Sequence, residues 1–153
     1  MTTCDVRIVP AEYEHIPVIA DNIRDADRQE LYDFCQLNPT EAIEQSFFAA
    51  KRSWTGLVDG VPVCMFGVTR GEGTLGIPWL VTTKDIEQHS VIFLRRCKPV
   101  VYEMMHGFKK LENYVAAGNI LAITWLKWLG FTFGREEEVG PFNKPFIKFW
   151  MSL

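Results

Sequence analysis

A tight turn near the middle of the chain constrains the fold more than any other feature. Asp59-Gly60 lies between two runs, residues 53–58 and 61–69, that are rich in apolar and β-branched side chains. A two-residue Asp-Gly connection favours the turn of a β-hairpin, because both residues tolerate the positive φ angles that this turn requires. The chain is therefore predicted to contain an antiparallel pair of strands, which the other elements extend or cover.

The spacing of apolar residues predicts the elements around this hairpin. Pro99 lies inside a long helical pattern and is expected to kink it or to begin a new helix. The expected strands cover residues 5–9, 53–58, 61–69, 77–82, 111–117, 131–135 and 145–151, and the expected helical stretches cover 10–35, 39–51, 86–108 and 120–129. This order predicts a single α+β domain over residues 1–153, with one largely antiparallel sheet and helices on its faces.

Composition excludes several classes of protein. With 48% hydrophobic residues in 153 positions, the chain has enough apolar side chains for a real core, and disorder is excluded. No apolar run approaches the ~18 residues that a membrane span needs, and Asp5 and Arg7 interrupt any signal-peptide core. The four cysteines lie far apart and lack metal-site spacing, so we expect reduced thiols, a cytosolic location and no metal.

The charge is small and unevenly distributed. A net charge of −3 argues against a general nucleic-acid-binding role. Residues 1–75 carry −6, whereas residues 76–153 carry +3. A small anionic ligand is therefore expected to bind the second half of the chain.

One segment in the last third resembles a known superfamily. Residues 119–131 read Asn-Ile-Leu-Ala-Ile-Thr-Trp-Leu-Lys-Trp-Leu-Gly-Phe, which is similar to the pattern Asn-x-x-Ala-Ile-x-x-Tyr-x-x-x-Gly-Phe of GNAT N-acetyltransferases. The element order resembles this superfamily over nearly the whole chain. The resemblance implies a GNAT-like mixed sheet whose central strand pair splays apart, with acetyl-CoA or CoA as the ligand of the gap. Pro78 fits such a place, because proline in a strand needs an unpaired edge or a bulge.

A narrower resemblance covers roughly residues 5–151. The segments 20–31, 78–80, 113–115 and 125–131, together with Asn119, resemble a tailed-phage family of internal virion or GNAT-like proteins. This resemblance implies a phage product that acts in the cytoplasm of a bacterial host or is carried in the virion, with a virion or host protein as partner.

Two departures from the GNAT pattern bear on catalysis. The stretch 81–90, where these enzymes carry a glycine-rich pyrophosphate loop, has no glycine, and Asp85 and Glu87 would repel phosphate. Leu126 stands where the pattern has tyrosine, and an aliphatic side chain cannot donate a proton to a leaving thiolate. The residues proposed to bind a cofactor are Leu80, Val81, Thr82, Ser90, Arg95, Arg96 and Asn119. The alternative for Arg95 and Arg96 is that they form a solvated basic surface that binds no ligand.

The remaining site residues have two readings each. Asn119 either faces a cofactor or caps the following helix through its side chain. The residues proposed to bind substrate are Arg24, Asp27, Arg28, Trp79 and Asn113. The alternatives are that the three charged residues form a solvated helix face, that Trp79 packs in the core, and that Asn113 lies at a solvent-exposed strand edge. No catalytic residue is assigned, because Glu72, His89 and Glu30 are candidate bases without distinctive spacing.

Three functions remain open, of which the third and weakest is a binding module for another nucleotide-like metabolite in the same cleft. The first is a phage-encoded GNAT-fold protein with a degenerate acyl-CoA site that acts through protein contacts. The second is an active acyl-CoA-dependent N-acyltransferase that modifies a host protein or a small amine. Residues 145–151 are apolar on both faces of the expected strand, which predicts either burial inside the sheet or a contact with a partner subunit, so a homo-oligomer is also open.

Overall fold

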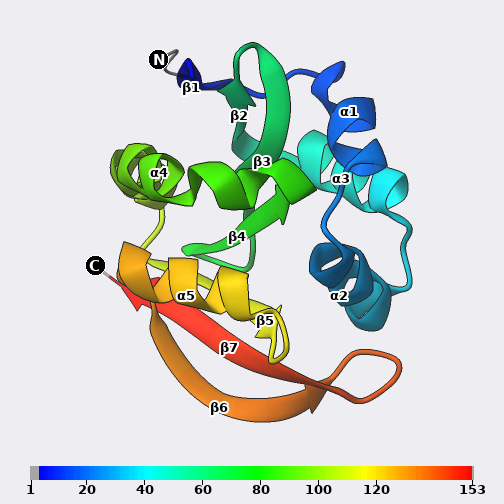
Figure 1. The fold of residues 1–153 in the computed structure, drawn as a ribbon. Helices are drawn as coiled ribbons and strands as arrows, with labels where there is room; N and C mark the ends of the chain where they lie inside the picture. Colours follow the sequence, from blue (N-terminus) through cyan, green and yellow to red (C-terminus); the bar gives the residue numbers. More distant parts are fainter. Residues whose placement is uncertain (1–3, 153) are drawn as a thin grey trace.

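The computed structural model describes residues 4–152 and consists of one mixed seven-stranded sheet with helices on both faces (Figure 1). The strand order is β1-β2-β3-β4-β5-β7-β6. The strands are β1 Val6–Pro10, β2 Ala50–Val58, β3 Val61–Arg70, β4 Leu75–Thr82, β5 Lys110–Ala116, β6 Thr132–Val139 and β7 Lys144–Ser152. The helices are α1 His15–Asp21, α2 Asp25–Cys35, α3 Pro39–Ala49, the 3₁₀ helix η1 Lys84–His89, α4 Ser90–Met105 and α5 Ile120–Leu129. The predicted fold class is confirmed.

The hairpin at Asp59-Gly60 forms as predicted and sets the alternation of its strands. Val58 pairs with Val61 across the turn, and both turn residues have positive φ. Side chains of β3 then alternate between the two faces of the sheet. Phe66 packs in the core beneath α4 and α5, whereas Met65 packs in a second core with α1 and α3. The hairpin therefore divides the interior into two layers.

The central strands separate where the sequence predicted a gap. The parallel pairing of β4 with β5 contains only Leu75 with Lys110 and Gly76 with Leu111. Pro78 lies two residues beyond Gly76, so the residue without an amide hydrogen lies where β4 has no ladder partner on the β5 side. Beyond Gly76 the two strands run on as opposite walls of a gap that widens toward their carboxyl ends.

The predicted helical stretch 10–35 is wrong in two respects, because Pro10 belongs to β1 and the helical part, which begins at His15, is two helices. Between α1 and α2, Ile23 forms a single bridge with Thr83, and the amide of Arg24 donates to the carbonyl of Thr82 at 3.0 Å. A tertiary contact with the end of β4 thus takes the backbone groups that a continuous helix would use. The break places the start of α2 against the wide end of the gap.

Two further expectations concern Pro99 and the last strand. Helix α4 runs from Ser90 to Met105 through Pro99, so this proline does not begin a new helix. Strand β7 lies between β5 and β6 and is paired along both edges, with Phe146 and Phe149 buried. Burial inside the sheet accounts for its two apolar faces.

Gly76, the last residue of β4 that pairs with β5, generates the first prediction. A Cβ atom on Gly76 would lie 2.8 Å from Leu111 and 3.0 Å from Phe108, both of which are buried. Gly76→Ala is expected to lower the free energy of unfolding by roughly 1–3 kcal/mol through overpacking. Gly118→Ala is the control, because a Cβ at that position meets nothing within 4 Å. Urea denaturation of both variants checks this, and equal stabilities would contradict it.

Candidate functional site

The gap between β4 and β5 opens into a cavity of about 180 Å³ that reaches both faces of the sheet. Its lining includes Leu80 and Trp79 on β4, which point to opposite layers. Helices α4 and α5 contribute mainly apolar side chains to the lining, whereas α2 and the residue before it contribute the polar groups Arg24, Asp27 and Glu30. The cavity therefore connects the two layers through the sheet at the one place in the described chain where neighbouring strands separate.

Asp27 lies at the centre of a buried polar network at the wide end of the gap. Its Oδ2 accepts hydrogen bonds from the backbone amide of Thr82, at 2.8 Å, and from the Thr82 hydroxyl. Its Oδ1 accepts from the side-chain amide of Asn119 at 3.0 Å. One carboxylate therefore joins α2 to the end of β4 and to the residue that precedes α5.

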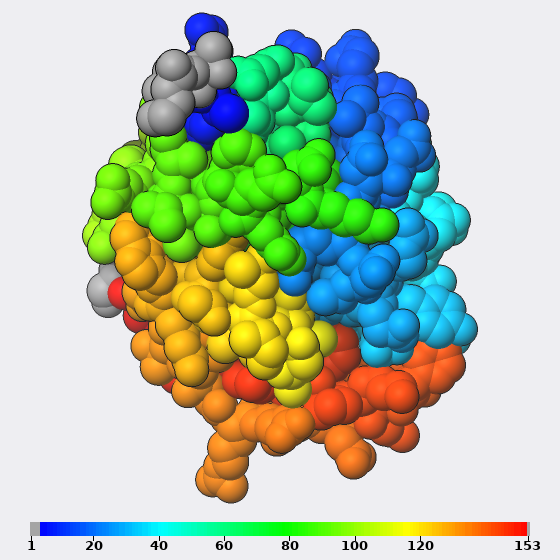
Figure 2. Space-filling view, viewed as in Figure 1, coloured from blue at the N-terminus to red at the C-terminus, as the bar shows by residue number. Residues whose placement is uncertain are grey.

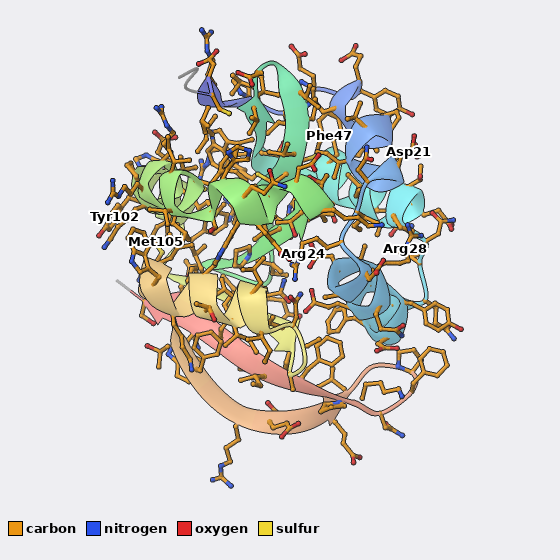
Figure 3. The ribbon with its side chains drawn as sticks, viewed as in Figure 1. Asp21, Arg24, Arg28, Phe47, Tyr102 and Met105 are labelled. Atoms are coloured by element: carbon orange, nitrogen blue, oxygen red, sulfur yellow. The ribbon has the colours of Figure 1, made fainter. Side chains whose placement is uncertain are left out.

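Arg24 supplies the positive charge of this network. Its guanidinium donates to Asp27 and to the Thr82 hydroxyl, each at 3.2 Å, and to the Asn119 carbonyl oxygen at 3.4 Å. Its Nε also lies 3.6 Å from the exposed carboxylate of Glu87. Figure 3 shows Arg24 where α2 meets α4 and α5, while Tyr102 lies on the outer side of α4. The network is buried, so its members must satisfy one another.

Two other side chains satisfy backbone groups along the gap. Oε1 of Glu30 accepts a hydrogen bond from the amide of Ala116 at 2.5 Å. Asn113 donates to the carbonyl of Pro78 at 2.7 Å, and its own carbonyl oxygen accepts from the amide of Tyr114 at 2.7 Å. These side chains replace the ladder hydrogen bonds that β4 and β5 lose when they separate.

Leu80 differs from its neighbours on β4. Backbone groups alternate in direction along a strand, so the amide and carbonyl of Leu80 point the same way as those of Pro78 and Thr82, into the gap. Within residues 4–152, no other segment donates to or accepts from Leu80 on this side. The middle of the gap therefore offers one donor and one acceptor to a ligand.

Glu30 has the most strongly perturbed carboxyl group of the site. Burial of this group raises its pKa to about 7, and the negative charge of Asp27 adds to the rise, while the hydrogen bond from Ala116 opposes it. A carboxyl group with this pKa exchanges its proton near neutral pH. It lies on the cavity wall and can accept a proton from a bound group.

The structure brings most of the predicted site residues together. Those that line the cavity are Leu80, Val81, Thr82, Asn119, Arg24, Asp27, Trp79 and Asn113. Arg28 is exposed and borders a separate shallow hollow beside α3. Ser90 begins α4, and Arg95 and Arg96 are exposed on that helix; none of the three lines the cavity. In Figure 2, green α4 and yellow α5 form the surface around this site and meet the blue amino-terminal segment.

The structure decides between two readings of Asn119. Its side chain makes no capping hydrogen bond to α5, so the N-cap alternative is wrong. It is instead 2% exposed and bonded to Asp27 and Arg24. The amide of Asn119 is thus a fixed part of the gap, with its orientation set from α2.

Among the three candidate bases, only Glu30 lines the cavity. Glu72 is exposed in the β3–β4 turn, at the narrow end of the gap, and His89 ends η1. One sequence signal for Glu30 exists: Asp27 and Glu30 are three residues apart, so they share a face of the predicted helix. Two carboxyl groups on one helix face are a pattern that could have identified it.

The segment that would face a pyrophosphate is built differently from a glycine loop. The amide of Thr83 donates to the carbonyl of Val63, and the amide of Lys84 donates to the carbonyl of Asn22. Asp85 and Glu87 are exposed in the first turn of η1. The first two amides of this segment are therefore engaged by the protein itself, and the nearby charges are negative.

The described residues form neither a metal site nor a membrane-spanning helix. In residues 4–152, no group of three or more histidine, cysteine or acidic side chains is arranged to hold a metal ion. No helix in that part of the chain combines the length and apolarity that crossing a bilayer requires. All four cysteines are free.

Comparison with known proteins identifies the fold. No protein-family model and no curated protein sequence matches the chain. Among solved structures, a GNAT-family acetyltransferase of Streptococcus pneumoniae has a TM-score of 0.68 at 14% identity, covering 97% of this chain and 99% of that one. A candidate acetyltransferase of Acinetobacter baylyi has a TM-score of 0.73 at 14% identity, covering 99% and 95%.

A third similar structure contains ligands. The aminoglycoside acetyltransferase AAC(6')-Ib, solved with coenzyme A and kanamycin, has a TM-score of 0.68 at 11% identity, covering 97% of this chain and 95% of that one. At these identities the likeness establishes the fold, and the chain has the fold of GNAT acetyltransferases.

The Asp27 network generates a stability prediction. Asp27→Ala leaves the Arg24 guanidinium without its buried carboxylate and the Thr82 amide without its acceptor, and removal of one partner of a buried pair typically costs about 3–5 kcal/mol. Asp25→Ala, on the exposed side of the same helix turn, is expected to cost less than about 1 kcal/mol. Chemical denaturation measures both, and similar losses would contradict the central role of Asp27.

The pKa of Glu30 generates a prediction for stability against pH. Because folding raises this pKa from 4.5 to about 7, the folded protein holds the proton more tightly, and stability falls as pH rises between these values. Relative to Glu30→Gln, the parent is expected to lose on the order of 2–3 kcal/mol over this range and little above it. Urea titrations at pH 5, 6, 7 and 8 measure the difference, and parallel profiles would contradict it.

Proposed function

We propose that this protein is an acyl-CoA-dependent N-acyltransferase. One observation carries the proposal: the cavity that crosses the sheet is lined both by the unpaired backbone of Leu80 and by the carboxyl group of Glu30. A thioester needs a donor for its carbonyl oxygen, and an amine nucleophile needs an acceptor for its proton. Both requirements are met on facing walls of one cavity.

The proposed reaction is direct transfer. The amine nitrogen attacks the thioester carbonyl carbon while the backbone amide of Leu80 hydrogen-bonds the carbonyl oxygen. Glu30 accepts the proton that the amine loses, the carbon–sulfur bond breaks, and free CoA thiol and an N-acyl amine result. Binding both substrates in one cavity supplies proximity and orientation. Asn119 and Asp27 hold the wide end of the gap in place, and neither needs to change its charge.

The residues fit the thioester part of the donor better than its nucleotide part. The gap supplies the amide and carbonyl of Leu80 to a pantetheine-like arm. The segment from Thr83 to His89 lacks glycine and carries Asp85 and Glu87, so phosphate recognition falls to the basic face of α4 that includes Arg95 and Arg96. We therefore expect most of the affinity for the donor to come from the arm and the acyl group.

The acceptor is proposed to enter from the α2 side. Glu30 and Asp27 both line this side of the cavity, and the carboxyl group of Glu30 loses its proton near pH 7. An amine that binds there meets negative charge and a proton acceptor. Apolar side chains, Leu31 and Phe34, complete this wall. The acceptor class is accordingly a primary amine attached to an apolar body.

The activity test is release of free thiol from acyl-CoA in the presence of a panel of primary amines. Glu30→Gln is expected to lower kcat/KM by roughly 100-fold or more, the usual scale for loss of a general base. In the parent, kcat/KM should rise about tenfold per pH unit below pH 7 and level off above it, because only ionised Glu30 accepts the proton. Asp25→Asn, on the same helix but exposed, is the matched control.

Two results would contradict this proposal. The first is thiol release that is unchanged in Glu30→Gln. The second is the absence of both thiol release and calorimetric binding for every acyl-CoA offered. The second result would favour the other function described below.

A second proposed function is that of a GNAT-fold phage protein that works through protein contacts. The observation in its favour is that Asp27 links Thr82 to Asn119 across the wide end of the gap, where a pantetheine arm would pass. Together with the glycine-free segment and Leu126, this supports a degenerate acyl-CoA site. The phage context rests on the sequence resemblance, and none of the three structures named above is described as a phage protein.

The contact role has its own test. A tagged chain expressed during infection of a bacterial host is expected to be found in purified virions or to retain one specific virion or host protein. Asp27→Ala would open the gap without touching the outer surface, so the contact role predicts unchanged retention in this variant if it folds. The acyltransferase proposal instead predicts thiol release with no stable protein partner.

A further inference from the structure

We infer that α4 and α5 present a docking surface for an anionic lipid bilayer. The surface is the outer face of these two helices, on the side turned away from the cavity, and the folded protein lies on the bilayer through it without inserting a helix. This inference goes beyond the proposed function and does not depend on it, because it concerns the solvent-exposed side chains of α4 and α5 and not the cavity beneath them.

A stripe of exposed side chains runs along α4. Its members are Val91, Arg95, Lys98 and Tyr102, which follow one another at intervals of four, three and four residues and so share one face of the helix. Tyr102 is 69% exposed, and Figure 3 shows it on the outer side of α4. The stripe therefore has an apolar or aromatic side chain at each end and two cations between them.

Helix α5 continues this surface with a second stripe. Ile120, Thr124 and Lys127 follow one another at intervals of four and three residues, Trp128 is the next residue, and all four are exposed. The Nζ atom of Lys98 lies 4.9 Å from the centroid of the Trp128 ring, so a cation–π contact joins the two stripes. In Figure 2, green α4 and yellow-to-orange α5 lie next to each other on the face turned to the viewer.

The charges of this face determine the sign of the partner. Helices α4 and α5 together carry one carboxylate, Glu103, and four cations, which are Arg95, Arg96, Lys98 and Lys127. Residues 1–75 carry a net charge of −6, and Asp85 and Glu87 lie in η1, before the amino end of α4. An anionic surface therefore attracts the protein through the outer face of α4 and α5 and repels its amino-terminal half, which orients the molecule.

The exposed apolar side chains favour a bilayer as the anionic partner. Tryptophan and tyrosine suit the boundary between headgroups and hydrocarbon, because each combines an apolar ring with a polar group. Lysine side chains extend their charge to headgroups while their methylene stems lie along apolar surface. A second copy of this face is disfavoured as the partner, because it would place cations opposite cations. Tyr102 and Trp128 beside Lys98 and Lys127 therefore fit a surface that is anionic outside and apolar beneath.

The test is flotation of the whole protein with lipid vesicles at about 0.1 M salt. One set of vesicles is pure phosphatidylcholine, and the other contains about one-third phosphatidylglycerol, an anionic lipid. Binding to the anionic set is expected to be at least about tenfold tighter, because each cation near such a surface contributes roughly fivefold. Most of this binding should be lost at about 1 M salt, where the Debye length falls to about 3 Å.

A pair of double variants tests the location of the surface. Lys98→Gln with Lys127→Gln is expected to weaken binding to the anionic vesicles by roughly 25-fold, about fivefold for each lost cation. Lys51→Gln with Lys144→Gln removes the same charge from exposed positions at the starts of β2 and β7, and should weaken binding less than about threefold. Both pairs keep the arginines of α4, which the proposed function uses for the donor. Thermal melting checks that both fold.

Trp128 provides a second readout that charge alone does not move. All five tryptophans belong to the described residues, and Trp128 alone among them is exposed. Vesicles whose acyl chains carry bromine are expected to quench part of the tryptophan emission of the bound protein. This quenching should disappear in Trp128→Phe, which keeps an apolar ring and should still bind. A bound parent protein that shows no quenching would overturn the contact with the hydrocarbon boundary.

Three other outcomes would overturn the inference. The first is equal binding to neutral and anionic vesicles, or binding to neither. The second is an equal loss of binding in the two double variants, which would show an effect of net charge and not of this face. The third is retention on soluble polyglutamate but not on vesicles, which would favour an acidic polypeptide as the partner. Thiol release is measured without lipid, so none of these outcomes decides the proposed function.

Discussion

The separation of β4 from β5 after Gly76 and Leu111 is the constraint on which the rest of this structure depends. Strands that part inside a protein leave backbone amides and carbonyls without ladder partners, and such groups are costly when they remain unsatisfied. This protein satisfies several of them with side chains. Asp27 takes the amide of Thr82, Glu30 takes the amide of Ala116, and Asn113 serves both strands. The gap is thus held open by replacement of its hydrogen bonds.

The side chains that satisfy the gap place charged groups in the interior, and the balance of these charges sets the net charge of the site. Arg24 and Asp27 form a buried pair that is neutral as a unit. Glu30 has no cation of its own, so burial keeps its proton on until about pH 7. Near neutral pH the site can therefore switch between no net charge and one negative charge. Under the proposed function, the side chain that satisfies the amide of Ala116 is also the one that accepts a proton from the amine.

The sequence predicts what is local or periodic. Asp59-Gly60 predicts the hairpin, Pro78 marks the unpaired part of β4, and the pattern from Asn119 to Phe131 indicates the fold. Each of these is a backbone preference or spacing that a few neighbouring residues express. The gap itself is what the GNAT resemblance implies, and Pro78 agrees with it.

The remaining features depend on contacts between distant segments. The division of residues 10–35 into two helices follows from the hydrogen bond between Arg24 and Thr82, which are 58 positions apart. The role of Asn119 depends on Asp27, 92 positions away. Capping preference favoured a local bond for Asn119, but the buried carboxylate of Asp27 is a stronger acceptor for its amide. Tertiary electrostatics overrides local preference at both places.

The charged and the apolar side chains of the cavity come from different elements. The charged groups come from α2 and the residue before it and meet Thr82 and Asn119 at the wide end of the gap, whereas α4 and α5 line the cavity with apolar side chains. Under the proposed function, a donor therefore meets both kinds of side chain in one cavity. A phosphate cannot anchor such a ligand at Thr83 or Lys84, whose amides are already bonded within the protein. Under the proposed function, most of the affinity for the donor therefore has to come from the arm and the acyl group inside the gap.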